Sequence, residues 1–113
     1  MDLKTFYCEI GGNYEETFKR FMTDERILKF VRKFPLDGSF ALLKTSLAEK
    51  KVEDAFRAAH TLKGVAQNLG FDRLFVTAEK VTNILRGGSL EVDALMPELE
   101  ELYNLTITAI NNL

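Results

Sequence analysis

The spacing of hydrophobic residues predicts a chain built from helices. Apolar residues recur three and four positions apart over most of the sequence, and no stretch shows a convincing strand-like alternation of apolar and polar residues. Glycine, proline and N-cap residues divide the first part of this pattern into three short helices. The first helix is predicted to end at Gly11-Gly12, and the second to begin at Asn13, paired with Glu16. The third is predicted to begin at Thr23 or Asp24 and to end at Pro35.

The rest of the chain predicts four longer helices. Their expected ranges are about 37–49, 53–69, 71–86 and a last helix that begins between Ser89 and Asp93, with Lys50-Lys51, Gly70 and Gly87-Gly88 between them. Pro97 lies just past the first turn if the last helix begins at Asp93, and otherwise bends it. The expected apolar faces include Tyr14, Phe18, Phe21 and Met22 in the second short helix, and Leu95, Leu99, Leu102, Leu105 and Ile110 in the last helix. These patterns predict an all-α protein of one domain, 1–113, in which short helices in 1–35 precede an antiparallel four-helix bundle over about 37–113.

Composition adds few constraints beyond those of a soluble globular domain. Hydrophobic residues make up 46% of the 113 residues, charged residues make up 28%, and the net charge of −2 favours neither nucleic acid nor anionic lipid as a partner. The single cysteine, Cys8, excludes an internal disulfide, and with one distant histidine it argues against a structural zinc site. No signal-peptide or membrane-length apolar run is seen, so a cytoplasmic location without a membrane partner is expected.

The only histidine, His60, lies in the helix predicted over 53–69, in which successive residues advance by about 100°. With His60 at zero, Gly64 falls at about 40°, Gln67 at about 340° and Lys63 at about 300°. The opposite side carries the small and apolar residues Ala55, Ala58, Leu62, Val65, Ala66 and Leu69. His60 therefore lies in the middle of a polar helix face, where position alone predicts only a solvated side chain.

Three neighbours favour a functional role for this histidine. Gly64 costs about 1 kcal/mol relative to alanine in a helix interior, so it calls for a packing or an access reason. Lys63 can bring its ammonium group to an anion held on the imidazole, although by itself it would be interpreted as a solvated lysine. Gln67, one turn further along, can donate to a phosphate oxygen or to water. Together they indicate a phosphate-accepting imidazole on the outside of a bundle.

The surroundings of His60 contain no catalytic machinery that the sequence can identify. Phe56, beside Arg57, is an aromatic residue on the side expected to face solvent, and it either covers a helix edge or forms part of an apolar docking patch. No glycine-rich nucleotide loop, nucleophile elbow or second histidine is present. A nucleophilic His60 would therefore need another protein to bring the phosphoryl group.

The stretch His60-Thr61-Leu62-Lys63-Gly64, followed by Ala66, Leu69-Gly70, Phe71 and Leu74, resembles the histidine-containing phosphotransfer (HPt) domains of two-component phosphorelays. The resemblance covers the four helices from about residue 37 and leaves the first 35 residues outside the shared core. It implies that His60 accepts a phosphoryl group from a receiver-domain aspartate and passes it to another receiver. Lys63 would stabilise the phosphate, Gly64 would give the partner access, and Phe56 and Arg57 are the expected docking residues.

The same resemblance implies a carrier rather than an enzyme, with no cofactor of its own and with Mg²⁺ supplied by the receiver. The implied partners are response-regulator receiver domains and a hybrid histidine kinase, with the chain acting as a monomer. Several family members brace the histidine with a glutamine on the following helix. The matching position here is Thr82, whose hydroxyl reaches less far, and Gln67 is the candidate substitute.

Two other functions are compatible with these residues. A helical interaction adaptor would keep the fold without phosphorylation, with His60 as a contact residue and Phe56 as an anchor. An enzyme that uses His60 as a general base lacks supporting residues.

Overall fold

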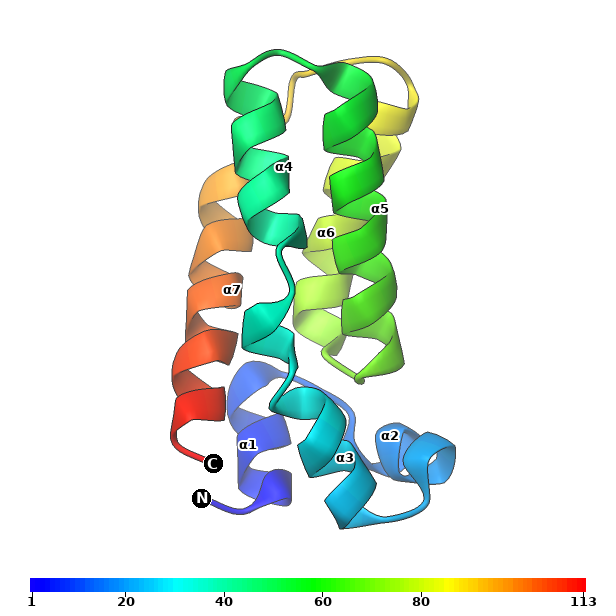
Figure 1. Ribbon diagram of the computed structural model, residues 1–113, viewed down its shortest axis with the longest axis vertical. Helices are drawn as coiled ribbons and strands as arrows, with labels where there is room; N and C mark the ends of the chain where they lie inside the picture. The colour runs from blue at the N-terminus through cyan, green and yellow to red at the C-terminus, as the bar shows by residue number, and fades with distance from the viewer.

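The computed structural model describes residues 1–113 as seven α-helices and one short 3₁₀ turn (Figure 1). In chain order they are α1 (Leu3–Ile10), α2 (Tyr14–Phe21), α3 (Asp24–Val31), the turn η1 (Phe34–Leu36), α4 (Ser39–Ala48), α5 (Val52–Asn68), α6 (Asp72–Arg86) and α7 (Met96–Asn111). Helices α4 to α7 run alternately up and down, and α1 to α3 lie at the end of the bundle where α5 turns into α6. The all-α class and the four-helix bundle predicted over about 37–113 are both confirmed.

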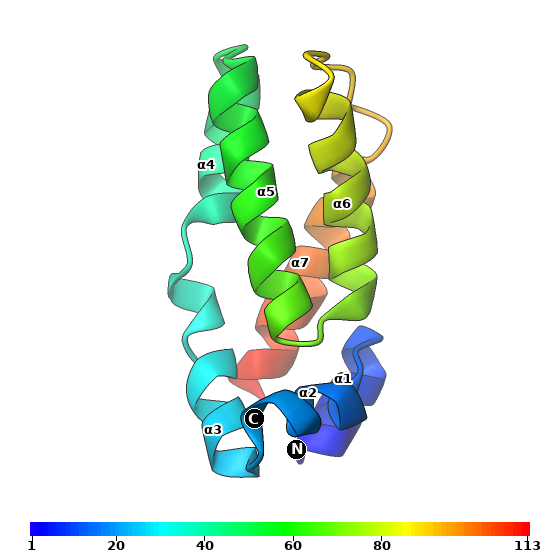
Figure 2. The same cartoon turned by 90° about the vertical axis from the view of Figure 1, so that its right-hand side faces the viewer.

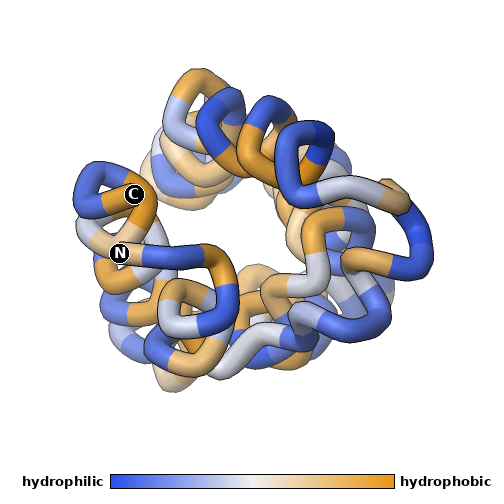
Figure 3. Tube along the Cα trace, turned by 90° about the horizontal axis from the view of Figure 1, so that it is seen from below, coloured by the Kyte–Doolittle hydropathy of each residue, from blue (hydrophilic) through white to orange (hydrophobic).

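The N-terminal helices share one continuous core with the bundle. Its centre is an aromatic cluster in which the ring of Phe71 lies 5.9 Å from that of Phe6 and 5.2 Å from that of Phe34. The same buried cluster contains Tyr7 and Ile27 from the N-terminal helices together with the core residues of α4 to α7. Seen from below, the chain surrounds a common axis, and hydrophobic and hydrophilic positions alternate along each helix (Figure 3). Burial against α1 and α3 therefore stabilises the bundle directly.

The predicted capping residues set the boundaries of the short helices. Gly11 ends α1 with a φ of +67°, a conformation that glycine adopts without the cost a side chain would add. The side chain of Asn13 accepts a hydrogen bond from the Glu16 N–H at 3.0 Å, and that of Thr23 accepts one from the Arg26 N–H at 3.2 Å. These bonds satisfy N–H groups that a helix start leaves free, so each new helix begins where its capping residue stands.

The end of α5 is held by hydrogen bonds from the N-terminal helices. The Tyr7 hydroxyl donates to the carbonyl oxygen of Leu69 at 2.6 Å, and the Asn13 N–H donates to that of Gly70 at 2.8 Å. Arg20 donates to the carbonyl oxygens of Gln67 and Asn68. The last carbonyl groups of a helix have no partner within it, so α1 and α2 supply the partners for the helix that carries His60.

Several sequence predictions about single elements were wrong. In α2, Thr17 is the buried residue, whereas Phe18 and Met22 are exposed. Helix α7 begins only at Met96, with Pro97 in its first turn, where proline is tolerated because its missing N–H would have no partner there. Residues 89–95 form a connection that buries Val92, and Leu105, expected to point inward, is exposed.

Helices α4 and α7 meet through one stacked pair and one ion pair. The rings of Phe40 and Tyr103 stack with centroids 4.3 Å apart, and Lys44 Nζ lies 2.7 Å from Glu100 Oε1. None of the seven helices combines the length and the apolarity needed to cross a bilayer.

Candidate functional site

His60 is exposed to solvent at about the middle of α5. The predicted amphipathic split places the buried residues Ala55, Ala58, Leu62 and Ala66 on the other side of this helix. The imidazole lies beside the ring of Phe56, with ring centroids 5.8 Å apart and an interplanar angle of 54°. The ring nitrogens are therefore presented from a helix whose opposite face is fixed in the core.

The residue one turn from His60 leaves open space. A Cβ atom placed on Gly64 would meet no atom within 4 Å outside its own helix backbone, and the residue is exposed. Of the two reasons that the sequence allowed for this glycine, packing is excluded because nothing approaches it. The remaining reason is access, because the surface beside His60 carries no side chain at this point.

Lys63 supplies a cation on the same face without a carboxylate partner. Its side chain is half-buried, and the four salt bridges of the protein use Lys19, Lys44, Lys51 and Arg57 instead. An ammonium group that has no internal ion pair can neutralise an anion that arrives on the neighbouring imidazole.

A groove of about 470 Å³ runs from His60 along the side of α5 that faces α3, η1 and the start of α4. The buried residues Phe34 and Leu69 line it from within. The other lining residues are Phe30, Lys33, Asp37, His60, Thr61, Gly64, Val65 and Asn68. In Figure 2, α3 and η1 continue the line of α4 along the same side of α5. His60 and Gly64 therefore stand at the edge of a surface hollow rather than on a flat helix face.

Asp37 stands in this groove with its carboxylate already engaged. It accepts hydrogen bonds from the backbone N–H of Ser39, at 2.9 Å, and from the Ser39 hydroxyl. The sequence predicted Asp37 as the cap of this helix, but α4 begins at Ser39 with Gly38 in the N-cap position, and Asp37 bonds to Ser39 from one residue earlier. Burial, together with the charge of Asp37, raises the pKa of the Tyr103 phenol.

Phe56 and Arg57, the two predicted docking residues, lie in different surroundings. Phe56 is half-buried at the edge between α5 and α6, where the Arg86 guanidinium carbon lies 5.5 Å from the centroid of its ring. Arg57 is exposed, pairs with Asp54 at 3.2 Å, and lines a second hollow together with Leu42 of α4. Phe56 therefore covers a helix edge while it also contacts the imidazole.

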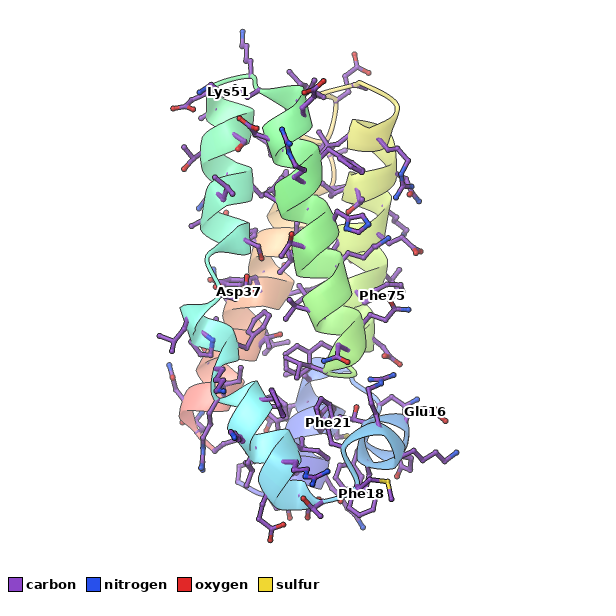
Figure 4. The ribbon with its side chains drawn as sticks, turned by 45° about the vertical axis from the view of Figure 1, so that its right-hand side comes forward. Glu16, Phe18, Phe21, Asp37, Lys51 and Phe75 are labelled. Atoms are coloured by element: carbon purple, nitrogen blue, oxygen red, sulfur yellow. The ribbon has the colours of Figure 1, made fainter.

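Neither candidate for a bracing residue reaches His60. The Thr82 side chain is fully buried, and its hydroxyl donates to the carbonyl oxygen of Ala78 at 2.7 Å. Gln67 lines another hollow with Glu16 and Phe75, and Figure 4 shows Phe75 and Asp37 on opposite sides of α5. Gln67 shares the angular position of His60, but seven residues separate them by about 10 Å along the helix axis.

The wall of the groove that α3 and η1 provide was not predicted from the sequence. Phe30, Lys33 and Phe34 were assigned no role in the site. The sequence carries no clear signal for this wall, because Phe30 lies three residues after Ile27 and four before Phe34, at the spacing of an ordinary buried helix face. Which helix it would face depends on tertiary packing.

No group of three or more His, Cys, Asp and Glu side chains lies close enough together to hold a metal ion. The site therefore consists of an imidazole, a nearby ammonium group, open space at Gly64 and a groove beside them. Such an arrangement can accept a transferred group at the imidazole and can contact the partner that brings it.

A family model described as the Hpt domain matches residues 36–111. No curated protein and no solved structure gives a significant match to the chain. The matched segment covers most of the chain and contains His60, Lys63 and Gly64, but it leaves α1 to α3 outside. The chain belongs to the Hpt domain family, whose members are phosphocarriers rather than kinases and act in the histidine phosphotransfer of two-component signalling.

Proposed function

We propose that this protein is a phosphorelay carrier, in which His60 accepts a phosphoryl group from an aspartyl phosphate of one receiver domain and passes it to another receiver. The observation that carries the proposal is the placement of an exposed imidazole one turn from open space at Gly64. A phosphoryl group bound to a receiver reaches His60 only if the two protein surfaces approach closely. The missing side chain allows that approach.

The transfer needs only one nucleophile from this chain. The unprotonated ring nitrogen of His60 attacks phosphorus, the P–O bond to the receiver aspartate breaks, and its electron pair returns to the aspartate as a carboxylate. The imidazole then releases the proton held on its other nitrogen and remains as a phosphoramidate. The reverse step returns the phosphoryl group to the aspartate of a second receiver.

Charge stabilisation is divided between the two proteins. Lys63, which has no carboxylate partner, would neutralise part of the charge of the phosphoryl group on His60. The receiver would contribute its acidic pocket and Mg²⁺, because phosphoryl transfer depends mainly on positioning and charge stabilisation. Phe56 would hold the orientation of the imidazole through the contact between their rings.

The partners we propose are response-regulator receiver domains, including that of a hybrid histidine kinase. The carrier would act as a monomer in the cytoplasm, where its exposed Cys8 thiol stays reduced. Its role would then be to connect two receivers that do not exchange phosphoryl groups with each other.

The decisive experiment incubates the purified protein with phosphorylated receiver domains from the same cell and follows acid-labile, base-stable phosphate on this chain. Wild-type protein should be labelled, whereas His60→Gln should remain folded and unlabelled. Lys63→Gln should be labelled about tenfold more slowly, because an ammonium group near the transferred charge is lost. If no receiver labels wild-type protein in either direction, and His60→Gln binds receivers as well as wild type does, the protein is an interaction adaptor instead.

A further inference from the structure

One wall of the groove beside His60 comes from residues outside the segment that defines the family. Phe30 belongs to α3 and Lys33 follows that helix, whereas the family match begins at residue 36. The Phe30 side chain is 40% exposed although its ring lies 5.1 Å from that of Phe21. Lys33 Nζ lies 5.4 Å from the centroid of the same Phe30 ring. An apolar surface and a cation are thus held together a short way along the groove from His60.

Two lysines at or near this groove have no ion-pair partner, because Lys33 and Lys63 form no salt bridge. Asp37 also lines the groove and keeps its negative charge, because its hydrogen-bond donors on Ser39 are neutral, whereas Asp54 is paired with Arg57. Lys33, Lys63 and Asp37 together leave one positive charge in excess, although the whole chain has a net charge of −2. A partner that fits the groove therefore presents an apolar side chain beside carboxylates.

We infer that Phe30 and Lys33 form a docking contact for the receiver domain that exchanges phosphoryl groups with His60, and that this contact selects among receivers. The inference rests on the proposed function, because a receiver that brings its aspartate to His60 also covers the adjoining rim of the groove. A receiver is acidic at its phosphorylation site, and so its charge complements Lys33 and Lys63. Receivers differ in the residues around that site, so a contact beside His60 discriminates among them without altering the transfer step.

The test measures the initial rate of His60 phosphorylation against the concentration of each receiver in a panel from the same cell, each phosphorylated with acetyl phosphate and Mg²⁺. Phe30→Ala and Lys33→Glu are compared with Lys19→Glu, an equal charge reversal on α2 that does not line the groove. The exposed ion pair of Lys19 with Glu16 contributes little to stability, so this control should stay folded. Urea unfolding of each variant checks its fold. Lys33 is exposed, so Lys33→Glu keeps the test valid if Phe30→Ala unfolds.

For the preferred receiver, Lys33→Glu should raise the half-saturating concentration about tenfold and leave the rate at saturation unchanged. It should also weaken the dependence on salt concentration, which a purely structural role would not do. Phe30→Ala should raise the half-saturating concentration with unchanged salt dependence, and Lys19→Glu should behave as wild type. If both groove variants match wild type with every receiver, or if Lys19→Glu is impaired as much as Lys33→Glu, the docking inference is wrong while the phosphorelay function stands. Wild-type protein that no receiver phosphorylates would overturn both.

Discussion

At the scale of single residues, Gly64 differs from the glycines that the fold needs for packing. A Cβ atom on Gly12 would lie 2.6 Å from the Tyr7 ring, and one on Gly70 would lie 1.8 Å from the Thr17 hydroxyl oxygen. A Cβ atom on Gly64 would contact nothing. The fold therefore excludes side chains at Gly12 and Gly70, whereas at Gly64, as at Gly38, it leaves room for one.

This difference predicts opposite effects of Gly64→Ala on stability and on transfer. The variant should raise the free energy of unfolding by about 1 kcal/mol, because alanine favours the helix more than glycine does. It should slow phosphoryl transfer from a receiver several-fold, and Gly64→Gln should slow it by about a hundredfold, because a misfit of about 1 Å is costly in an oriented reaction. Urea unfolding and single-turnover transfer measure the two effects. A stabilised variant with undiminished transfer would show that the glycine does not serve access.

At the scale of helices, the sequence predicted those boundaries that local chemistry sets. Asn13 and Thr23 begin helices because their side chains accept backbone N–H bonds close by in the sequence. The start of α7 was predicted too early because the chain before Met96 is a non-helical connection that buries Val92 in the core. The helical period of 3.6 residues predicted that His60 lies on an exposed helix face. The groove beside His60 depends instead on where α3 packs. Local pattern thus located the candidate nucleophile, whereas only tertiary contacts located its surroundings.

The connection between α5 and α6 depends on glycine at position 70. Its φ of +74° is unfavourable for other residues, and the Thr17 hydroxyl occupies the place of a Cβ atom. Gly70→Ala should lower the free energy of unfolding by about 3 kcal/mol, since both the left-handed conformation and the overlap are costly. Gly38→Ala is the matched control, because a Cβ atom there meets nothing within 4 Å. Equal urea midpoints for the two variants would contradict the close contact at Gly70.

The burial of the Tyr7 phenol, which donates from α1 to the end of α5, predicts a loss of stability at high pH. Burial raises the pKa of Tyr7 to about 12 from its usual value near 10. Because the folded state favours the protonated phenol, the contribution is complete below pH 10 and is lost as the pH rises from 10 to 12, by at most about 3 kcal/mol. Tyr7→Phe should be less stable than wild type at pH 8 and should lose less stability between pH 9 and 12. Parallel pH profiles for the two proteins would exclude this role of Tyr7.

At the scale of the whole molecule, the family-matched segment and the cooperative unit differ in extent. The match covers residues 36–111, but the core also contains Phe6, Tyr7, Ile27 and Val31. The N-terminal helices furthermore provide the hydrogen-bond donors for the carbonyl groups at the end of α5. The N-terminal amino group even donates to the carbonyl oxygen of Asn112 at 3.3 Å, so α1 lies against the end of α7 (Figure 1). The chain is therefore expected to fold as one domain, 1–113.

Removal of residues 1–35 tests this expectation. Each large apolar side chain lost from a core costs about 2–5 kcal/mol, whereas a domain of this size is stable by only about 5–15 kcal/mol in total. The truncated chain should therefore show no cooperative unfolding transition in urea when followed by circular dichroism, although its α4 to α7 sequence is intact. Adding residues 1–35 back as a separate peptide should restore part of the helical signal if the contacts with Leu69 and Phe71 suffice to direct assembly. A truncated protein that unfolds cooperatively at the wild-type urea midpoint would show instead that the four-helix bundle is a domain by itself. In that case α1 to α3 would be an addition whose remaining role is the groove beside His60.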